Sequence, residues 1–171
     1  TGLSNIIGGD SRKKSWPDEP FSGLKDIFPQ TKAIVCVTDD GGSTGELLKD
    51  LPFIALGDLR HVLLSSIRKE DLQAAYGLGE ADCLQVAKML HRLVNYRFDK
   101  QPDSIEKLMA AVDLDSAGLP EPMSQYLTGL LDLLFTDPRL SRLISRPHCL
   151  GNLLLAAAIW QGADELHQKE Q

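Results

Sequence analysis

The stretch KAIVCVT at residues 32–38 runs directly into DDGGSTG at residues 39–45. The first part is short, continuously apolar and rich in β-branched residues, which is typical of a strand buried on both faces of a parallel sheet. The second part is a turn rich in glycine and acid, after which apolar spacing resumes at Leu47 and Leu48. The pattern predicts a central parallel strand followed by a loop at its carboxyl end, where open α/β sheets bind their ligands.

Most of the remaining chain has a helical pattern, punctuated by proline and glycine. A short helix is predicted at 21–28, and longer ones at 82–97, 104–112, 122–135, 138–144 and 151–165. One strand among so many helices predicts a helix-rich α/β fold. Because a buried parallel strand needs neighbours on both sides, and the sequence starts at Thr1 without a methionine, we expect a single, partial domain over residues 1–171.

Composition excludes several classes of protein. The 171 residues are 43% hydrophobic and 25% charged, as in an ordinary soluble domain. A net charge of −6 argues against a partner such as nucleic acid, whose binding needs a basic surface. The longest nearly apolar run, residues 149–160, is much shorter than the roughly 20 residues that cross a membrane. We therefore expect neither a nucleic-acid nor a membrane partner.

The three cysteines are far apart and include no CxxC pair, which indicates neither a disulfide framework nor a zinc site. Cys36 and Cys83 fall in apolar patterns and are predicted to be small buried side chains. The N-terminus has no features of a signal peptide, so we expect a cytoplasmic protein.

The loop after the predicted strand is the strongest candidate for chemistry. Asp39 and Asp40 would repel a bare phosphate, so the residues favour Mg²⁺ between carboxylate and phosphate oxygens. Gly41 and Gly42 would let the backbone approach a ligand closely, and Ser43 adds a hydroxyl. The same composition is also typical of a plain turn capped by aspartate.

Two further segments could contribute to the same site. In LGDLRH at 56–61, Asp58 is either the N-cap of a helix or a third carboxylate, and Arg60 can form a fork onto a phosphate. In RPHCLGNL at 146–153, Gly151 and Asn152 open an apolar helix whose free N–H groups could bind an anion. His148 is either a hydrogen-bonded loop histidine or a catalytic one. His91 is expected on a helix surface.

Taken together, these segments resemble a known family. VTDDGGSTGELLKDLP at 37–52, GDLRH at 57–61, NYRF at 95–98 and HCLGNLLLAAA at 148–158 resemble the family of 2-phospho-L-lactate transferase (CofD) and the gluconeogenesis factor YvcK. The opening TGLS resembles the tail of the family's glycine-rich phosphate loop. The resemblance covers about residues 1–98 and 146–162, and the motifs are specific only in combination.

The resemblance implies a Rossmann-like, mostly parallel sheet with helices, and a ligand that is a nucleotide or a nucleotide-linked phospho-compound. In the transferase branch, Mg²⁺ assists transfer of a phospholactyl group from a guanosine-diphospho donor to a deazaflavin. Asp40 and Asp58 match the acidic positions near metal and acceptor, and so are the predicted catalytic and metal-binding residues. The predicted ligand-binding residues are Thr1, Gly2, Ser4, Asp39, Gly41, Gly42, Ser43, Arg60, His148, Gly151 and Asn152. We expect a homo-oligomer.

Some features depart from the transferase pattern. The DDGGSTG loop is closer to the YvcK branch, which implies a non-catalytic nucleotide-sugar-binding regulator as the alternative function. His61 replaces the asparagine that usually follows the arginine, and residues 99–146 have no counterpart that can be placed, so they are predicted to be a helical insertion. A helical interaction domain with incidental turns is the third possibility.

Overall fold

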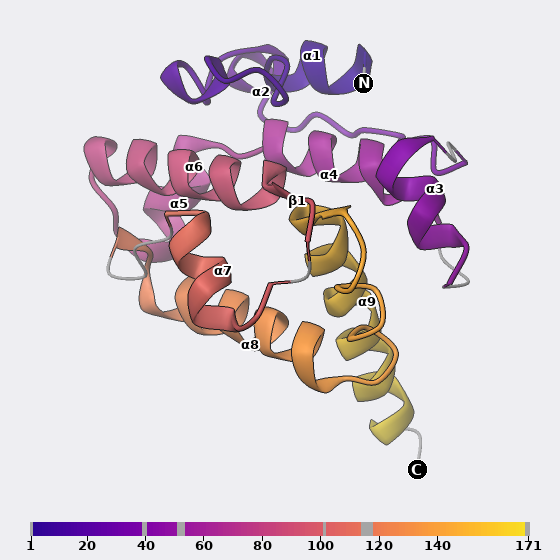
Figure 1. The fold of residues 1–171 in the computed structure, drawn as a ribbon. Coiled ribbons are helices and arrows are strands. Elements are labelled where there is room, and N and C mark those ends of the chain that lie inside the picture. Colours follow the sequence, from indigo (N-terminus) through magenta and orange to yellow (C-terminus); the bar gives the residue numbers. More distant parts are fainter. Residues whose placement is uncertain (1, 39–40, 51–53, 101, 114–117, 170–171) are drawn as a thin grey trace.

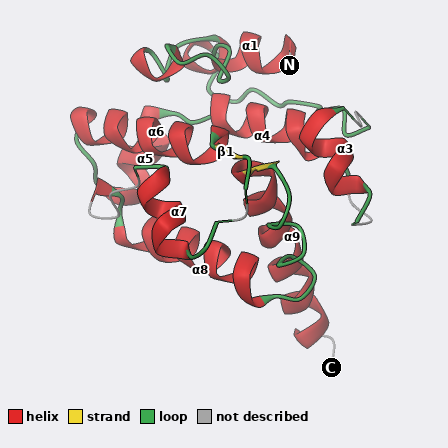
Figure 2. Ribbon diagram, viewed as in Figure 1, coloured by secondary structure: helices red, strands yellow, loops and turns green. Residues whose placement is uncertain are grey.

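The structure is a computed structural model that describes residues 2–38, 41–50, 54–100, 102–113 and 118–169. It is built almost wholly from helices (Figure 2). The elements are α1 (Gly2–Gly8), the 3₁₀ helix η1 (Trp16–Asp18), α2 (Leu24–Ile27), α3 (Gly42–Leu48), α4 (Leu56–Ser65), α5 (Lys69–Tyr76), α6 (Glu80–Asn95), β1 (Arg97–Phe98), α7 (Ile105–Ala111), α8 (Glu121–Thr136), β2 (His148–Cys149) and α9 (Leu150–Lys169).

The helices are arranged in layers around α4 and α6 (Figure 1). The N-terminal segment with α1 and α2 covers one side of this pair, and α1 packs against α4. On the other side, α9 contacts α4, α6 and α8. The short strands β1 and β2 pair antiparallel, with Arg97 opposite Cys149 and Phe98 opposite His148. This pairing fixes where the chain enters α9.

Leucine side chains supply most of the core between α6, α8 and α9. Leu93, Leu131, Leu134 and Leu153 are all fully buried in one cluster. Residues 99–146, predicted to be an insertion, contribute Leu131 and Leu134 to this cluster, so this segment is packed into the same core as the rest. A smaller cluster joins α5 to α6 and includes Cys83, whose predicted burial is confirmed.

The helix predictions hold in most of the chain. The helices predicted at 82–97, 104–112, 122–135 and 151–165 are confirmed as α6, α7, α8 and α9, with shifted ends. The helix predicted at 138–144 is wrong. The chain there forms consecutive turns, in which the Asp137 carbonyl accepts from the N–H groups of Leu140 (3.0 Å) and Ser141 (2.8 Å). These turns place Leu140, Leu143 and Ile144 in the core without a helix.

The predicted strand at 32–38 is also wrong, because the structure assigns no strand there. The side chain of Ile34 is 95% exposed. The backbone makes one bond across to the chain before α4, in which Ala55 N–H donates to the Val37 carbonyl at 2.9 Å. An apolar parallel strand is stable only when ladders on both sides satisfy its backbone, and the strands among the described residues are β1 and β2 alone. The helix-rich class is therefore confirmed, whereas the described residues contain no parallel sheet.

Two further expectations depended on neighbours that the sequence does not reveal. Cys36 is exposed rather than buried, since the strand that would have covered it does not form. His91 is buried rather than on a surface, because the ring of Trp16 stacks on it with centroids 5.4 Å apart. In the described part of the chain, no helix combines the length and apolar character that a membrane crossing requires.

Candidate functional site

The starts of α3, α4 and α9 are linked by close contacts that two glycines permit. A Cβ atom on Gly57 would lie 2.8 Å from the Thr44 hydroxyl, so the first turn of α4 lies directly against α3. A Cβ atom on Gly151 would overlap the Val94 carbonyl oxygen and crowd the side chain of Arg60, so α9 starts against both α6 and α4. The structure thus brings the GDLRH and HCLGNL segments into contact.

Arg60 is the centre of this contact region. Only 7% of its surface is exposed, although it carries a full charge. Its Nη1 donates to the Cys149 thiol, and its Nη2 lies 2.8 Å from His61 Nε2. Its Nε is buried and has no hydrogen-bond partner among the described residues. Burial lowers the pKa of Arg60, and the nearby Arg97 acts in the same direction.

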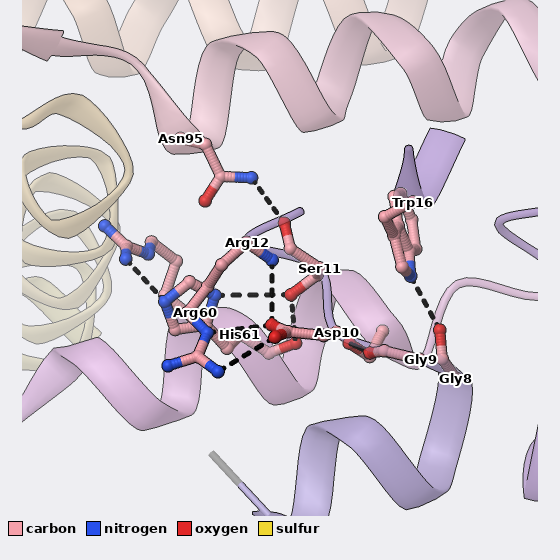
Figure 3. Close-up of polar contacts among 10 residues, drawn as sticks. Gly8, Gly9, Asp10, Ser11, Arg12, Trp16, Arg60, His61 and Asn95 are labelled. Carbon is pink, nitrogen blue, oxygen red and sulfur yellow. Dashed lines mark hydrogen bonds and ion pairs between the residues drawn. The ribbon is translucent and has the colours of Figure 1, made fainter. Parts of the chain in front are cut away.

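His61 continues the hydrogen-bond chain toward the N-terminal segment (Figure 3). Arginine can only donate, so His61 Nε2 accepts from Arg60 and the proton of the ring is on Nδ1. Nδ1 then donates to Ser11 Oγ at 3.2 Å, and Ser11 Oγ donates to the His61 carbonyl at 3.3 Å. Asn95 Nδ2 donates to the Ser11 carbonyl at 2.8 Å. We call Ser11, Arg60, His61, Asn95 and Cys149 the Arg60 cluster.

Electrostatics keep His61 neutral. Burial, assisted by the charges of Arg60 and Arg12, lowers the pKa of His61 to about 4. The ring is therefore a neutral hydrogen-bond relay near pH 7, and protonating it would remove the acceptor that Arg60 uses.

A partly exposed rim of charges borders this interior. Arg12 forms a two-point ion pair with Asp10, with Nε–Oδ1 2.8 Å and Nη2–Oδ2 2.9 Å. These hydrogen bonds lower the pKa of Asp10 to about 2. Asp58 lies nearby, since its charge raises the pKa of Arg12 and opposes the lowering at His61. Asp58 is in the first turn of α4, but the N-cap is Ala55, so the predicted capping role of Asp58 is wrong.

The β2–α9 wall is more enclosed than the sequence suggested. His148 is 1% exposed, and burial together with Arg146 lowers its pKa, against the opposing charges of Glu46 and Asp50. Asn152 is 2% exposed, and its Oδ1 has no hydrogen-bond partner among the described residues. Gly151 is buried by its contact with Val94 and Arg60, so its lack of a side chain serves helix packing.

The other predicted residues lie apart from this wall or outside the described part. Gly2 and Ser4 are in α1, and Ser4 is buried. Gly41 is the N-cap of α3 and Gly42 is its first residue, with φ +56°. Thr1, Asp39 and Asp40 lie outside the described residues, as does the side chain of Ser43. The predicted pairing of Asp40 with Asp58 therefore stays a prediction.

Sequence reasoning did not select Ser11, His61, Asn95 or Cys149. Asn95 and Cys149 stand within the quoted motifs, and His61 directly follows Arg60, so their positions were available signals. Ser11 gave no such signal, because it reaches His61 across 50 positions of sequence.

Comparison with known proteins identifies the family. A family model described as 2-phospho-L-lactate transferase CofD matches residues 19–168. The chain belongs to the CofD family. No curated protein and no solved structure matches it. The predicted resemblance to CofD is thus confirmed.

The range that matches CofD includes four members of the Arg60 cluster, namely Arg60, His61, Asn95 and Cys149. Ser11, with the Asp10–Arg12 pair, precedes it. The part of the site that lies within the CofD range is therefore the helical wall, and the preceding segment adds the hydrogen-bonded cover over His61.

Proposed function

We propose that this chain binds a nucleotide diphospho-type ligand with Mg²⁺ and transfers a phospho-containing group, in the manner of a phospholactyl transferase. The observation that carries the proposal is its membership of the CofD family over residues 19–168. The contact of the GDLRH and HCLGNL segments at Arg60 supports it, because residues from distant parts of the sequence meet at one place. The Rossmann-like sheet expected for this function belongs to the same proposal.

The ligand would approach from the rim rather than from the buried wall. Asp58 and Arg12 are partly exposed there, while His148 and Asn152 are not. A Cβ atom on Gly42 would meet nothing within 4 Å, so the backbone at the start of α3 is open to a ligand. In this proposal Arg60 holds α4 and α9 in place, and Asp58 orients the acceptor hydroxyl.

The described residues supply only part of the set of ligands that Mg²⁺ would need. Asp58 is an oxygen donor of the kind Mg²⁺ prefers. The described residues contain no group of three acidic, histidine or cysteine side chains that would hold a metal, and Asp39 and Asp40 lie outside them. Asp58 alone does not make a metal site, so no step of the proposed reaction is assigned to Mg²⁺.

In the proposed reaction, the oxygen of an acceptor hydroxyl forms a bond to phosphorus. The bond from that phosphorus to the bridging oxygen breaks, and nucleoside monophosphate leaves with the electron pair. The hydroxyl proton passes to solvent or to a carboxylate. Asp58 and Asp10 are described carboxylates at the rim, and Asp10 is held by Arg12, so we assign this role to Asp58. The protein contributes positioning and charge complementarity rather than a covalent nucleophile.

The test is an assay of nucleoside monophosphate release from guanosine-diphospho donors with hydroxyl acceptors, in the presence of Mg²⁺. Asp58→Asn should lower turnover by orders of magnitude, and Asp132→Asn, at an exposed position of α8, should not. Asp40→Asn is expected to act like Asp58→Asn. Equal turnover in the Asp58 and Asp132 variants would contradict the role of Asp58.

The DDGGSTG loop favours one alternative, a YvcK-like regulator that binds a nucleotide sugar without turnover. Calorimetry with nucleotide sugars, with and without Mg²⁺, separates the two functions. Tight binding without Mg²⁺, together with no monophosphate release from any donor, would support the regulator. A cytoplasmic homo-oligomer is part of both proposals, and sedimentation velocity tests the association.

A further inference from the structure

A groove of about 340 Å³ lies between the N-terminal segment and α6. Its described lining includes Lys14, Lys88 and Arg92, together with Gln85 and the ring of His91. Lys14 comes from the turn before η1, and the other four residues are in α6. Lys88 and Arg92 are four positions apart and so lie on the same face of the helix. Three cations from two distant segments therefore border one space.

The charge of this groove is opposite to that of the chain as a whole, which is −6. The described lining of the groove contains no carboxylate. Asp18 and Glu19, which follow Pro17 in the chain, line a different groove together with Glu80. A concave surface whose charged groups are all positive raises the local concentration of anions. The groove is therefore suited to an anionic ligand.

The cations of the groove are accessible and mostly without counter-ions. Among the described residues, no ion pair involves Lys14 or Lys88. Arg92 pairs with Asp113 at 2.5 Å, but both side chains are partly or largely exposed, at 41% and 82%. His91 is 8% exposed, and its Nε2 has no hydrogen-bond partner in the described part of the chain. Because that atom is buried, the donors that a ligand can reach are the two ammonium groups and the guanidinium.

We propose that this groove binds a small polyphosphate anion, a chain of two or three linked phosphate groups. One exposed cation contributes little to the binding of an ion, because solvent screens it. Several cations around one space favour an anion that carries several charges close together, and phosphate oxygens accept from ammonium and guanidinium groups alike. A chain of phosphates can reach both Lys14 and Lys88, whereas a single phosphate cannot use all the cations. Asp58 and the Arg60 cluster are not part of the described lining, so the proposal does not depend on the transferase activity.

The test compares phosphate, pyrophosphate and tripolyphosphate by calorimetry with the full chain, at low salt and without Mg²⁺. Tripolyphosphate should bind at least about tenfold more tightly than phosphate. Lys14→Gln and Lys88→Gln should each weaken tripolyphosphate binding about threefold, and the double variant about tenfold. Asp113→Asn should strengthen binding, because it removes the carboxylate that competes for Arg92. Lys107→Gln is the matched control, at an exposed position of α7 outside the lining, and should leave binding unchanged.

Chemical labelling of lysine amines, read by mass spectrometry, locates the bound anion. Tripolyphosphate should protect Lys14 and Lys88 from the label and leave Lys107 as reactive as before. Equal affinity for all three probes, or an equal loss of binding in Lys107→Gln, would overturn the proposal. A triglutamate peptide that binds more tightly than tripolyphosphate would also overturn it, since an acidic peptide would then be the ligand. Turnover of guanosine-diphospho donors, measured in the same variants, reports on the transferase proposal independently.

Discussion

Lys25 of α2, which contacts the last residue of α4, and Arg60 in the middle of α4 are two buried cations, and the structure satisfies them differently. Lys25 is 3% exposed and donates to the carbonyls of Pro20 (2.5 Å) and Ser65 (2.7 Å), with its ammonium 5.8 Å from the centre of the Trp16 ring. We call Gly8, Trp16, Lys25 and Ser65 the Lys25 seam. Arg60, in contrast, has a thiol and a neutral ring as partners, and its Nε has no partner in the part of the chain that the structure describes.

The difference separates a cation that strong carbonyl acceptors satisfy from one whose described partners are weaker acceptors. Strong carbonyl acceptors surround Lys25, and it joins the N-terminal layer to the end of α4. Arg60 joins α4 to the start of α9, and its partners are a thiol and a neutral ring rather than carbonyl groups. Both cations are packed beside a glycine, Gly8 for Lys25 and Gly151 for Arg60, whose Cβ atoms would overlap backbone oxygens. The contact geometry is thus similar, and the hydrogen bonding is not.

The largest expected effect comes from the two glycines. Gly8→Ala and Gly151→Ala should each lower the free energy of unfolding by about 3 kcal/mol, because the methyl group overlaps the carbonyl oxygen of Ser65 or Val94. Gly162→Ala is the control within α9, where a Cβ meets nothing within 4 Å, and it should raise stability by about 1 kcal/mol. Urea unfolding measures all three. The anion-binding role predicted for Gly151 stays a prediction, and a Gly151 variant of unchanged stability that fails to bind phosphate would support it.

The two cations themselves should differ next. Lys25→Met should cost about 2 kcal/mol of unfolding free energy, since the carbonyls of Pro20 and Ser65 lose their donor inside the protein. Arg60→Met should cost less than about 1 kcal/mol, because an apolar side chain suits the aliphatic surroundings and the variant removes a buried charge that no described carboxylate pairs with. The measurement is chemical denaturation at pH 7. Equal losses of unfolding free energy in the two variants would contradict a difference between the Lys25 seam and the Arg60 cluster.

The pH dependence of stability should distinguish the regions further. The pKa of His61 is lowered to about 4 in the folded protein from an ordinary 6.5. Between these values the unfolded chain binds the proton and the native state does not, so stability falls as pH decreases from 6.5 toward 4. His61→Gln should reduce proton uptake on unfolding by about one proton in this window. Burial also lowers the pKa values of His148 and His91, which add acid sensitivity in the same direction.

For the Lys25 seam, the pH range over which stability changes is alkaline. Burial lowers the pKa of Lys25 to about 8 from 10.5. Between these values the unfolded chain holds the proton that the native state has released, so stability rises as pH increases from 8 toward 10.5. His61→Gln should therefore leave the profile above pH 8 unchanged. If it altered that limb as much as the acid one, the two regions would not titrate separately.

The smallest expected difference is between two cysteines, Cys149, which accepts from Arg60, and Cys36, which is exposed. Cys149→Ser retains a hydrogen-bond acceptor at nearly the same place and should cost about 1 kcal/mol. Cys36→Ser, at an exposed position, should remain within about 0.5 kcal/mol of the unaltered protein. Thermal unfolding of both variants is sufficient to compare them. A larger loss for Cys36→Ser would indicate that the segment at 32–38 is packed more closely than its exposure suggests.

The sequence by itself determined the features that are encoded over short distances along the chain. The apolar spacing of α6, α8 and α9 repeats every three to four residues, so their helices and buried leucines follow from local pattern. The combination of DDGGSTG, GDLRH and HCLGNL was sufficient to indicate the family, which the match of the CofD model to residues 19–168 confirms.

Only the tertiary structure decided the features that depend on distant partners. The segment at 32–38 has the composition of a strand, but a strand exists only when other strands complete its backbone hydrogen bonds. Ser11, His61 and Asn95 meet from three separate segments, and Gly151 became a packing residue because Val94 and Arg60 lie against it. Local sequence fixes which conformations a segment favours, while burial and the pairing of polar groups are properties of neighbours far along the chain.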